Sequence, residues 1–422
     1  MGADGQMNIF TTEKNILKRV PVSKPPFGIA DLKKAIPPHC FKRSLIRSFG
    51  SFFRDLITIY TFYYLASTYI PLLPPTLSYA AWPLYWFAQG SILTGFWILG
   101  HECGHHAFSN YQWVDDAVGF FIHSVCLTPY FSFKYSHRSH HAHTNSIEYD
   151  EVYIPKRKSD TFYTEFLNNG PGNVFTLILR ITLGLPLYLI FNIYGRDYNG
   201  FANHFLPQSG IFNDRERGHV VLSDVGIAAV LYVLYQLVMR QGLKSTIFLQ
   251  GVPLFVMSGF FIILTYLNHT HPAIAHYDST EWDWLRGALS TIDRDFGILN
   301  RVFHNANHTH GIHHLFPTIP HYHVIEAREA VKPILGDYYM YDDTPILKAL
   351  WRDTKECIYV EPDEEKKGVY WVKERTDASR ATSRLFHNGK KRENSERFFR
   401  LLLKASNSSR SSQLFSCSPY NK

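Results

Sequence analysis

The chain has 422 residues, of which 16% are aromatic and only 19% are charged, below the ~25% charged fraction typical of soluble domains. Its apolar residues gather in long runs instead of recurring at helical spacing, which argues against two or three soluble domains and favours membrane spans. The five Cys are scattered, so no disulfide framework is expected and the catalytic parts should face a reducing compartment. The segment Met1–Pro26 is polar and lacks the apolar core of a signal peptide.

The net charge of +7 is confined to the end of the chain. Residues 377–422 contain ten Lys or Arg and three acidic residues, an excess that equals the net charge of the whole chain. Because the remainder is neutral, we expect no nucleic-acid partner and interpret 377–422 as a basic Ser/Arg-rich tail that is disordered. The rest divides into a cytosolic N-terminal segment, 1–55, and a membrane domain, 56–376.

Four apolar segments are long enough to cross a bilayer, which takes about 20 residues. Pro74 and Pro75 separate the first two and Arg240–Ser245 separates the last two, so each pair is predicted to form a hairpin. Basic residues between 33 and 54 predict a cytosolic N-terminus. Two weaker segments, Ala117–Phe133 and Val174–Tyr194, are predicted to lie at the membrane interface. The four predicted spans are Leu56–Leu73, Leu77–Gly100, Val220–Met239 and Thr246–Leu267.

Three histidine clusters stand outside these spans. Residues three and four apart share a helix face, so each cluster can point several imidazoles in one direction, and neutral imidazole is a favoured ligand of iron and zinc. One such cluster can arise by chance, but three together favour a metal site. The clusters are His101-Glu-Cys-Gly-His105-His106, His137-Arg-Ser-His140-His141 and His310-Gly-Ile-His313-His314.

The topology and the number of histidines both favour a centre with two metals. Ligands of one centre must converge, and the four-span arrangement puts all three clusters on one side of the membrane. Eight or nine imidazoles exceed the three protein ligands of a catalytic zinc. Glu102-x-x-His105 is the only Glu-x-x-His pair inside the clusters, which disfavours a ferritin-like carboxylate site. The predicted fold is therefore an all-α integral membrane protein, with four transmembrane helices in two hairpins, interfacial helices and a cytosolic His-rich di-metal cap.

Longer stretches around the clusters carry a family resemblance. Together with the clusters, they resemble the membrane fatty-acid desaturase superfamily, and above all the plant microsomal oleate Δ12 desaturase family with its acetylenase- and conjugase-type members. These stretches include Asp31-Leu-Lys-Lys-Ala-Ile-Pro-Pro-His-Cys-Phe, Asp150-Glu-Val-Tyr-Ile-Pro-Lys, Glu281-Trp-Asp-Trp-Leu-Arg-Gly-Ala-Leu, Pro320-His-Tyr-His and Lys355-Glu-Cys-Ile-Tyr-Val-Glu-Pro-Asp-Glu.

The resemblance implies a multi-pass enzyme of the endoplasmic reticulum membrane with its active site facing the cytosol. It implies two iron ions, O2 as oxidant, and electrons from NADH through cytochrome b5 and its reductase. The implied substrate is an oleoyl chain on a phospholipid, desaturated at Δ12, and the oligomeric state stays open between homo- and hetero-oligomer. Carried over, the iron ligands are His101, His105, His106, His137, His140, His141, His310, His313 and His314.

A further ligand is expected upstream of the third cluster. We assign His271, just past the last span, with His269 as the rival. His321 and His323 also match the family pattern, and we expect them to support the structure instead of binding iron.

The third cluster departs from the family pattern. Plain Δ12 desaturases usually have Asp where His308 stands and Val-Ala where Gly311-Ile312 stand. Changes beside a ligand alter its hydrogen bonding and hence the reactivity of the metal. The alternative outcome is therefore an acetylenic, conjugated or hydroxylated fatty acid. The tail also departs, because the family usually ends soon after Val369-Tyr-Trp371 with a retention signal.

Two other classes of protein remain as alternatives. His101-Glu102-x-x-His105 matches the zincin motif and would make the chain a membrane zinc metalloprotease, although the other two clusters would then have no role. A zinc transporter is disfavoured because the histidines lie outside the spans, whereas transport sites lie near mid-membrane.

Overall fold

The computed structural model describes residues 19–158 and 167–372. The predicted tail, 377–422, lies outside the described residues, so its predicted disorder stays a prediction. In chain order the helical elements are α1 (Ile29–Ala35), η1 (Pro38–Phe41), α2 (Leu45–Tyr69), η2 (Ile70–Leu72), α3 (Pro75–Gly104), α4 (Gln112–Val125), α5 (Tyr130–His143), α7 (Gly170–Phe191), α8 (Arg217–Gln241), α9 (Leu243–Thr246), η4 (Ile247–Gly251), α10 (Val252–His269), α11 (Trp284–Leu289), α12 (Leu299–Val302), α13 (His310–Leu315), α14 (Val324–Leu335), η5 (Gly336–Tyr338) and α15 (Ile346–Glu356).

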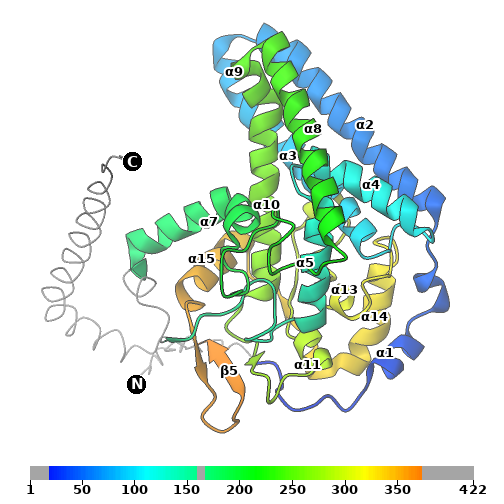
Figure 1. The fold of residues 1–422 in the computed structure, drawn as a ribbon, viewed down its shortest axis with the longest axis vertical. Helices are drawn as coiled ribbons and strands as arrows, with labels where there is room; N and C mark the ends of the chain where they lie inside the picture. The colour runs from blue at the N-terminus through cyan, green and yellow to red at the C-terminus, as the bar shows by residue number, and fades with distance from the viewer. Residues whose placement is uncertain (1–18, 159–166, 373–422) are drawn as a thin grey trace, which may run out of the picture. The chain divides into compact units, whose positions relative to one another are not determined.

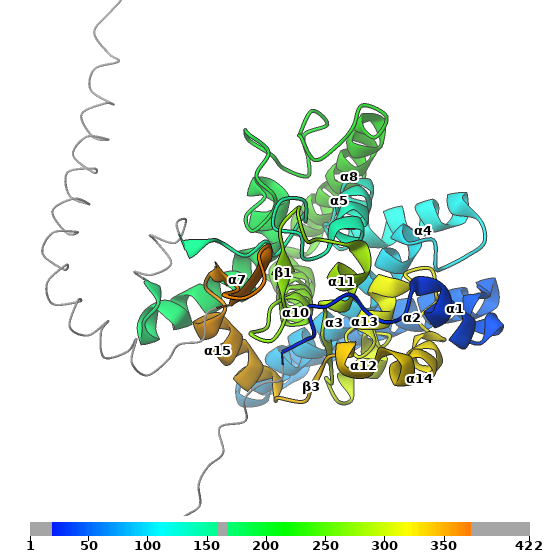
Figure 2. The same cartoon turned by 90° about the horizontal axis from the view of Figure 1, so that it is seen from below.

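Four long helices, α2, α3, α8 and α10, extend together away from the rest of the fold, and α7 lies across their base (Figure 1). Seen from below, α7 and α4 flank this bundle on opposite sides (Figure 2). The start of α2 lies beside the end of α3, because the Ser48 hydroxyl donates to the Phe108 carbonyl at 2.7 Å. The start of α8 lies beside α5, where the Phe131 N–H donates to Ser223 Oγ at 2.9 Å. The pair α2 and α3 therefore starts and ends at the base of the bundle, and so does the pair α8 and α10.

Within the described part of the chain, three helices are long and apolar enough to cross a membrane. They are α7, α8 and the continuous stretch Leu243–His269. The last two contain the predicted spans Val220–Met239 and Thr246–Leu267. The predicted span Leu77–Gly100 lies within α3, and Leu56–Leu73 starts in α2 and runs through η2. The many Tyr, Trp, Ser and Thr residues of α2 and α3 lower the mean hydropathy of these helices. The predicted interfacial segment Val174–Tyr194 lies mostly in α7, so length and composition alone do not reproduce the predicted four spans.

The other predicted interfacial segment, Ala117–Phe133, is not one continuous helix, because a turn separates its two helical parts. It covers most of α4, a left-handed residue at Leu127 (φ 52°), and the start of α5, with Pro129 at the N-cap of α5. Proline lacks an N–H and fixes φ, so it is tolerated at a helix start and disfavoured in the interior. The break allows α5 to turn its histidines toward α3.

The prediction of an all-α fold needs a correction, because short strands close the base. Strand β5 (Val369–Val372) pairs antiparallel with β1 (His276–Tyr277) and β4 (Val360–Pro362), in register His276↔Tyr370 and Val360↔Val372. Strand β2 (Asp293–Arg294) pairs parallel with β3 (Tyr341–Asp342). Strands of two to four residues carry no alternating pattern long enough to be recognised in the sequence.

Two apolar clusters of the core support the helices that carry histidines. One lies among α3, α4, α5 and α10, with Phe96 and Leu99 among its most buried members. The other joins the N-terminal segment to α13 and α14, where Leu32 and Cys40 pack in the same cluster as Ile312. The N-terminal segment therefore supports α13 directly.

A buried ion network fixes the end of α10. The guanidinium of Arg294, fully buried, lies 2.5 Å from Asp342 and 3.1 Å from Asp353, and its Nε donates to the Leu267 carbonyl at 2.7 Å. Burial opposes ionisation of Asp342, but the neighbouring His271 imidazole and the charge of Arg294 outweigh it, so the pKa of Asp342 lies well below its ordinary value. The network ties β2, β3 and α15 to the residues just before His269.

We expect Arg294→Met to destabilise the fold, because it removes the fully buried one of the two guanidinium groups, Arg294 and Arg352, that Asp342 and Asp353 share. Removing one partner of a buried ion pair costs about 3–5 kcal/mol. The matched control is Arg217→Met, which removes a half-exposed pair with Asp214 and should cost about 0–1 kcal/mol. Thermal unfolding of the detergent-purified proteins measures both, and equal melting temperatures for the two variants would contradict the assigned role of Arg294.

Candidate metal centre

The two HxxHH clusters lie on the helices α5 and α13. Each helix points two of its histidines in one direction and the third in another. In α5, His137 and His141 share one face and His140 points to another; in α13, His310 and His314 share a face and His313 points away. The pair from α5 meets the single histidine from α13, and the single histidine from α5 meets the pair from α13. Two separate groups of imidazoles result.

The first group contains five imidazoles, His101 and His105 from the end of α3, His137 and His141 from α5, and His313 from α13. The Nε2 atoms of His101 and His137 are 2.7 Å apart, those of His137 and His141 3.0 Å, and those of His101 and His105 3.2 Å. The buried Nε2 of His313 has no hydrogen-bond partner among the residues that the structure describes. Five nitrogen donors thus converge on one point.

The second group is built around His269, the last residue of α10. Its Nε2 lies 2.8 Å from Nε2 of His310 and 3.3 Å from Nε2 of His140. The Nε2 atoms of His310 and His314 are 3.1 Å apart. The two groups adjoin, since the rings of His141 and His314 stack with centroids 4.0 Å apart.

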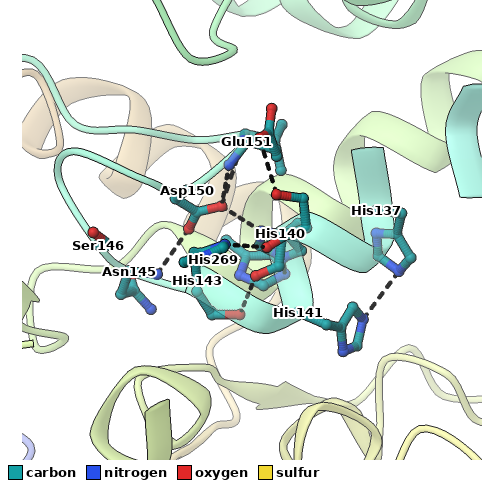
Figure 3. A network of polar contacts seen from close by, with 12 residues as sticks. His137, His140, His141, His143, Asn145, Ser146, Asp150, Glu151 and His269 are labelled. Atoms are coloured by element: carbon teal, nitrogen blue, oxygen red, sulfur yellow. Dashed lines mark hydrogen bonds and ion pairs between the residues drawn. The ribbon is translucent and has the colours of Figure 1, made fainter. Parts of the chain in front are cut away.

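Polar residues behind the second group fix which nitrogen faces inward (Figure 3). Asp150 accepts the Nδ1–H of His140 at 2.6 Å and also the backbone N–H of Asn145 at 2.7 Å. The Thr144 hydroxyl donates to the His140 carbonyl and so accepts the Nδ1–H of His314 at 3.1 Å. Because both Nδ1 atoms carry the proton, both Nε2 atoms present lone pairs to the interior of the group.

These donors fit metal ions. Burial, and next the neighbouring imidazoles, hold the pKa of His137, His141 and His314 well below the ordinary value, and burial lowers the pKa of His313 to about 4. The rings are therefore neutral near pH 7, the state in which imidazole binds a metal. Two groups of all-nitrogen donors suit two first-row metals such as iron, and no carboxylate takes part in either.

Two of the ten predicted ligands lie outside both groups. His106 has left-handed backbone (φ 58°), and its Nδ1 lies 2.5 Å from the buried carboxylate of Asp115. His271 faces the ion network: its Nε2 lies 3.4 Å from Asp342, and its Nδ1 accepts the N–H of Ala273 at 3.0 Å. The rival His269 lies in the second group and His271 does not, so the geometry favours His269, while the choice of ligand stays a prediction.

Sequence reasoning could not choose between His269 and His271, because α10 ends between them. His269 keeps helical backbone and faces α5, whereas Thr270 is extended (φ −126°, ψ 112°) and turns His271 away. Sequence reasoning also missed Asp150 and Thr144, which form hydrogen bonds with His140 and His314. Their proximity in sequence to His140 and His141 was the available signal.

An apolar cavity leads away from the two groups. His101, His137 and His140 line one end, together with His269, His310 and His313. Trp97, Phe133 and Phe261 form apolar walls, and residues of α7 line the side opposite α3. The cavity is therefore lined by histidines of both imidazole groups at one end and by apolar side chains along its walls.

Comparisons with known proteins agree with this geometry. The family model for fatty acid desaturase matches residues 78–345. The chain is 62% identical to a Δ12 fatty acid desaturase of Calendula officinalis over 374 residues, 88% of this chain and 99% of the relative. It is 58% identical to an omega-6 fatty acid desaturase, endoplasmic reticulum, of Brassica juncea, again over 88% and 99%. It is 58% identical to a fatty acid conjugase of Calendula officinalis over 86% and 98%.

The chain belongs to the fatty acid desaturase family and is an oxidoreductase acting on fatty acyl chains. Within that family it is similar to plant Δ12 desaturases, with conjugases among its relatives.

We expect the asparagine substitutions of His269 and His271 to differ in metal content. His269→Asn removes the ring at the middle of the second group and should lose about half of the bound metal. His271→Asn should retain the metal and lower only the melting temperature, because it weakens the Asp342 network. His106→Asn should also retain the metal. Plasma mass spectrometry of the purified proteins measures this, and metal loss in His271→Asn with retention in His269→Asn would reverse the assignment.

Proposed function

We propose that this chain is a membrane-bound acyl-lipid desaturase that uses O2 and two iron ions to introduce a double bond at Δ12 of an oleoyl chain. The observation that carries the proposal is the pair of neutral imidazole groups at the end of an apolar cavity, in a chain that is similar to Δ12 desaturases. The first iron would be held by His101, His105, His137, His141 and His313, and the second by His140, His269, His310 and His314. His106 and His271 are not needed as ligands.

The chemistry explains why metals are required. A methylene of an acyl chain has no acidic proton and no leaving group, so side-chain acid–base chemistry cannot start the reaction. Iron with O2 supplies an oxidant strong enough to abstract hydrogen from it. The overall reaction removes two hydrogens from the chain and, with two electrons and two protons, reduces O2 to two waters. The walls of the cavity hold the chain with its methylenes against the imidazole groups and exclude bulk water.

A cation in the cavity wall supports a phospholipid as the carrier of the acyl chain. Arg180 of α7 lines the cavity; its guanidinium lies 4.1 Å from the Tyr266 ring centroid and 3.3 Å from the Thr354 hydroxyl. Among the described residues no carboxylate forms an ion pair with it. A cation in a largely apolar site favours an anion, and the phosphodiester of a phospholipid supplies one.

We propose that α2, α3, α8 and α9–α10 cross the membrane in two hairpins and that α7 lies at its interface. In support, the start of α2 lies beside the end of α3, and the end of α3, the start of α8 and the end of α10 lie beside α5. Helices α2, α3 and α8 expose large apolar side chains such as Ile57, Leu84 and Val225. The proposed location is the endoplasmic reticulum membrane with the metal centre facing the cytosol, where cytochrome b5 and its reductase would deliver electrons from NADH.

The divergent outcome, an acetylenic, conjugated or hydroxylated product, is the second proposal. It is supported by the conjugase relative and by the surroundings of the third cluster. The Gly311 N–H donates to Asp293 at 2.8 Å, and a Cβ on Gly311 would lie 3.6 Å from the same oxygen, an ordinary contact. The glycine is therefore not required by the backbone, and it leaves space beside His310. The His308 carbonyl accepts from Arg328 at 2.6 Å.

The metalloprotease alternative has no support. Glu102, which would have to activate water, instead accepts hydrogen bonds from the backbone N–H and the Nδ1 of His321, at 3.2 and 2.7 Å. All three clusters contribute to the two imidazole groups, and the family is that of desaturases.

Expression in yeast with supplied oleate or linoleate tests the proposed reaction. We expect linoleate from oleate, identified by mass spectrometry of fatty acid derivatives. His140→Ala should give no product, because it removes one imidazole of the second group. Conjugated, acetylenic or hydroxylated products would favour the divergent outcome, and unchanged turnover in His140→Ala would refute the metal centre.

We expect Arg180→Gln to raise the KM for oleoyl-phosphatidylcholine about tenfold and to change kcat less than twofold, as for loss of one charge-assisted contact. Arg180→Lys should recover part of the loss. Arg157→Gln is the control, since Arg157 also lies over a tyrosine ring, at 5.5 Å from Tyr370, but does not line the cavity. Assays of the purified enzyme with defined lipids measure this, and equal KM values for Arg180→Gln and the wild type would exclude the contact.

A further inference from the structure

A second cluster of metal-binding side chains lies apart from the two imidazole groups. Its members are His39 and Cys40 of η1, and His323 and Glu326 at the start of α14. One donor atom from each lies within 4.8 Å of all the others, and His39 Nε2 is 2.9 Å from the Glu326 carboxylate. The two halves of the cluster are separated by more than 280 residues of sequence.

The donor set differs in kind from that of the desaturase centre. It combines one thiol, two imidazoles and one carboxylate, each of which zinc accepts as a ligand, and thiolate is a softer ligand than any in the two imidazole groups. Zinc bonds of about 2.0–2.3 Å put tetrahedral ligands about 3.3–3.8 Å apart, so donor atoms within 4.8 Å of one another need to close by about 1.5 Å or less.

The burial of the cluster suits entry of a cation from solvent. The Cys40 thiol is fully buried at the base, and the side chain of His323 is 13% exposed. His39 and Glu326 are half-exposed, at 52% and 51%. The exposed pair can rearrange around an entering ion at little cost, while the thiol is already held in place by the apolar core.

We propose that His39, Cys40, His323 and Glu326 bind one Zn²⁺ ion that fastens the N-terminal segment to α14. The site is independent of the proposed reaction, because it shares no ligand with the two imidazole groups. Its consequence for the fold follows from packing, since Cys40 lies in the same apolar cluster as Ile312 and Leu315 of α13. A cation here therefore supports, from the outside, the helix that carries the third histidine cluster.

The charges around the cluster are compatible with the ion. Zn²⁺ with one thiolate and one carboxylate is neutral overall, so it does not repel the nearby Arg47. The guanidinium of Arg47 lies 3.2 Å from His323 Nε2 and stacks on Tyr322 at 4.0 Å. Arg47 is exposed and can keep the Tyr322 contact while it releases the imidazole. Without a cation, burial and the Glu326 carboxylate raise the pKa of Cys40 to about 11, so binding releases the thiol proton.

Metal analysis of the purified full-length enzyme tests the proposal. After dialysis against a weak chelator, the wild type should hold about one zinc per chain in addition to its iron. Cys40→Ser and Glu326→Gln should each lose the zinc and keep the iron. Cys126→Ser is the control, since Cys126 is equally buried but belongs to no such cluster, and it should keep both metals.

A second measurement uses only the wild-type chain and so does not depend on a variant folding. Cobalt chloride added to the zinc-free enzyme should produce a thiolate-to-cobalt charge-transfer band, which the all-nitrogen groups cannot give, and zinc chloride should abolish it. Iron-replete enzyme without zinc and without this band would overturn the proposal, as would zinc retained in both Cys40→Ser and Glu326→Gln. Loss of iron alone would concern the desaturase centre and leave this site unaffected.

Discussion

The structure depends on bringing nine imidazoles together in a buried or partly buried place. Several of their Nε2 atoms approach one another to between 2.7 and 3.3 Å. Two lone pairs at that distance repel unless a proton or a cation lies between them. Burial removes the option of protonating every ring, because charged imidazoles would be desolvated and would repel one another. The cluster is thus stable as a metal-binding arrangement, and its surroundings maintain it.

The fold meets this constraint by gathering helix ends. The end of α3, the whole of α5, the end of α10 and the short α13 each contribute imidazoles, so no single element can form the two groups alone. Two sets of residues hold these helix ends in place: hydrogen-bonding side chains beside α5 and α13, and an ion network beside α10. Asp150 and Thr144 orient rings of α5 and α13, and the Arg294 network holds the end of α10. The apolar cavity opens where neither support lies, between α3, α7 and α10.

Local periodicity explains what the sequence could predict. The HxxHH spacing predicts rings on neighbouring helix faces, and both clusters do lie on helices that bring their histidines together. The spacing could not predict that α5 gives two histidines to the first group and one to the second, while α13 gives one to the first and two to the second. That division depends on how the two helices cross. His106 was predicted as a ligand from its place in the first cluster, but α3 ends just before it and Asp115 binds it. The short strands could not be predicted either, because they depend on pairing between segments that are far apart in the sequence.

The residues that hold the third histidine cluster in place also bear on the outcome of the reaction. Helix α13 provides ligands to both imidazole groups, so a small rotation of α13 moves both at once. Asp293 holds its first turn through the Gly311 N–H, and Arg328 holds the preceding residue His308. The N-terminal segment packs against its apolar face. The departures from the family pattern fall within these supports, at His308, Gly311 and Ile312, and not among the ligands. Divergence at these positions therefore changes how the ligands are held while every ligand is kept, which is the kind of change that can redirect an oxidation without abolishing it.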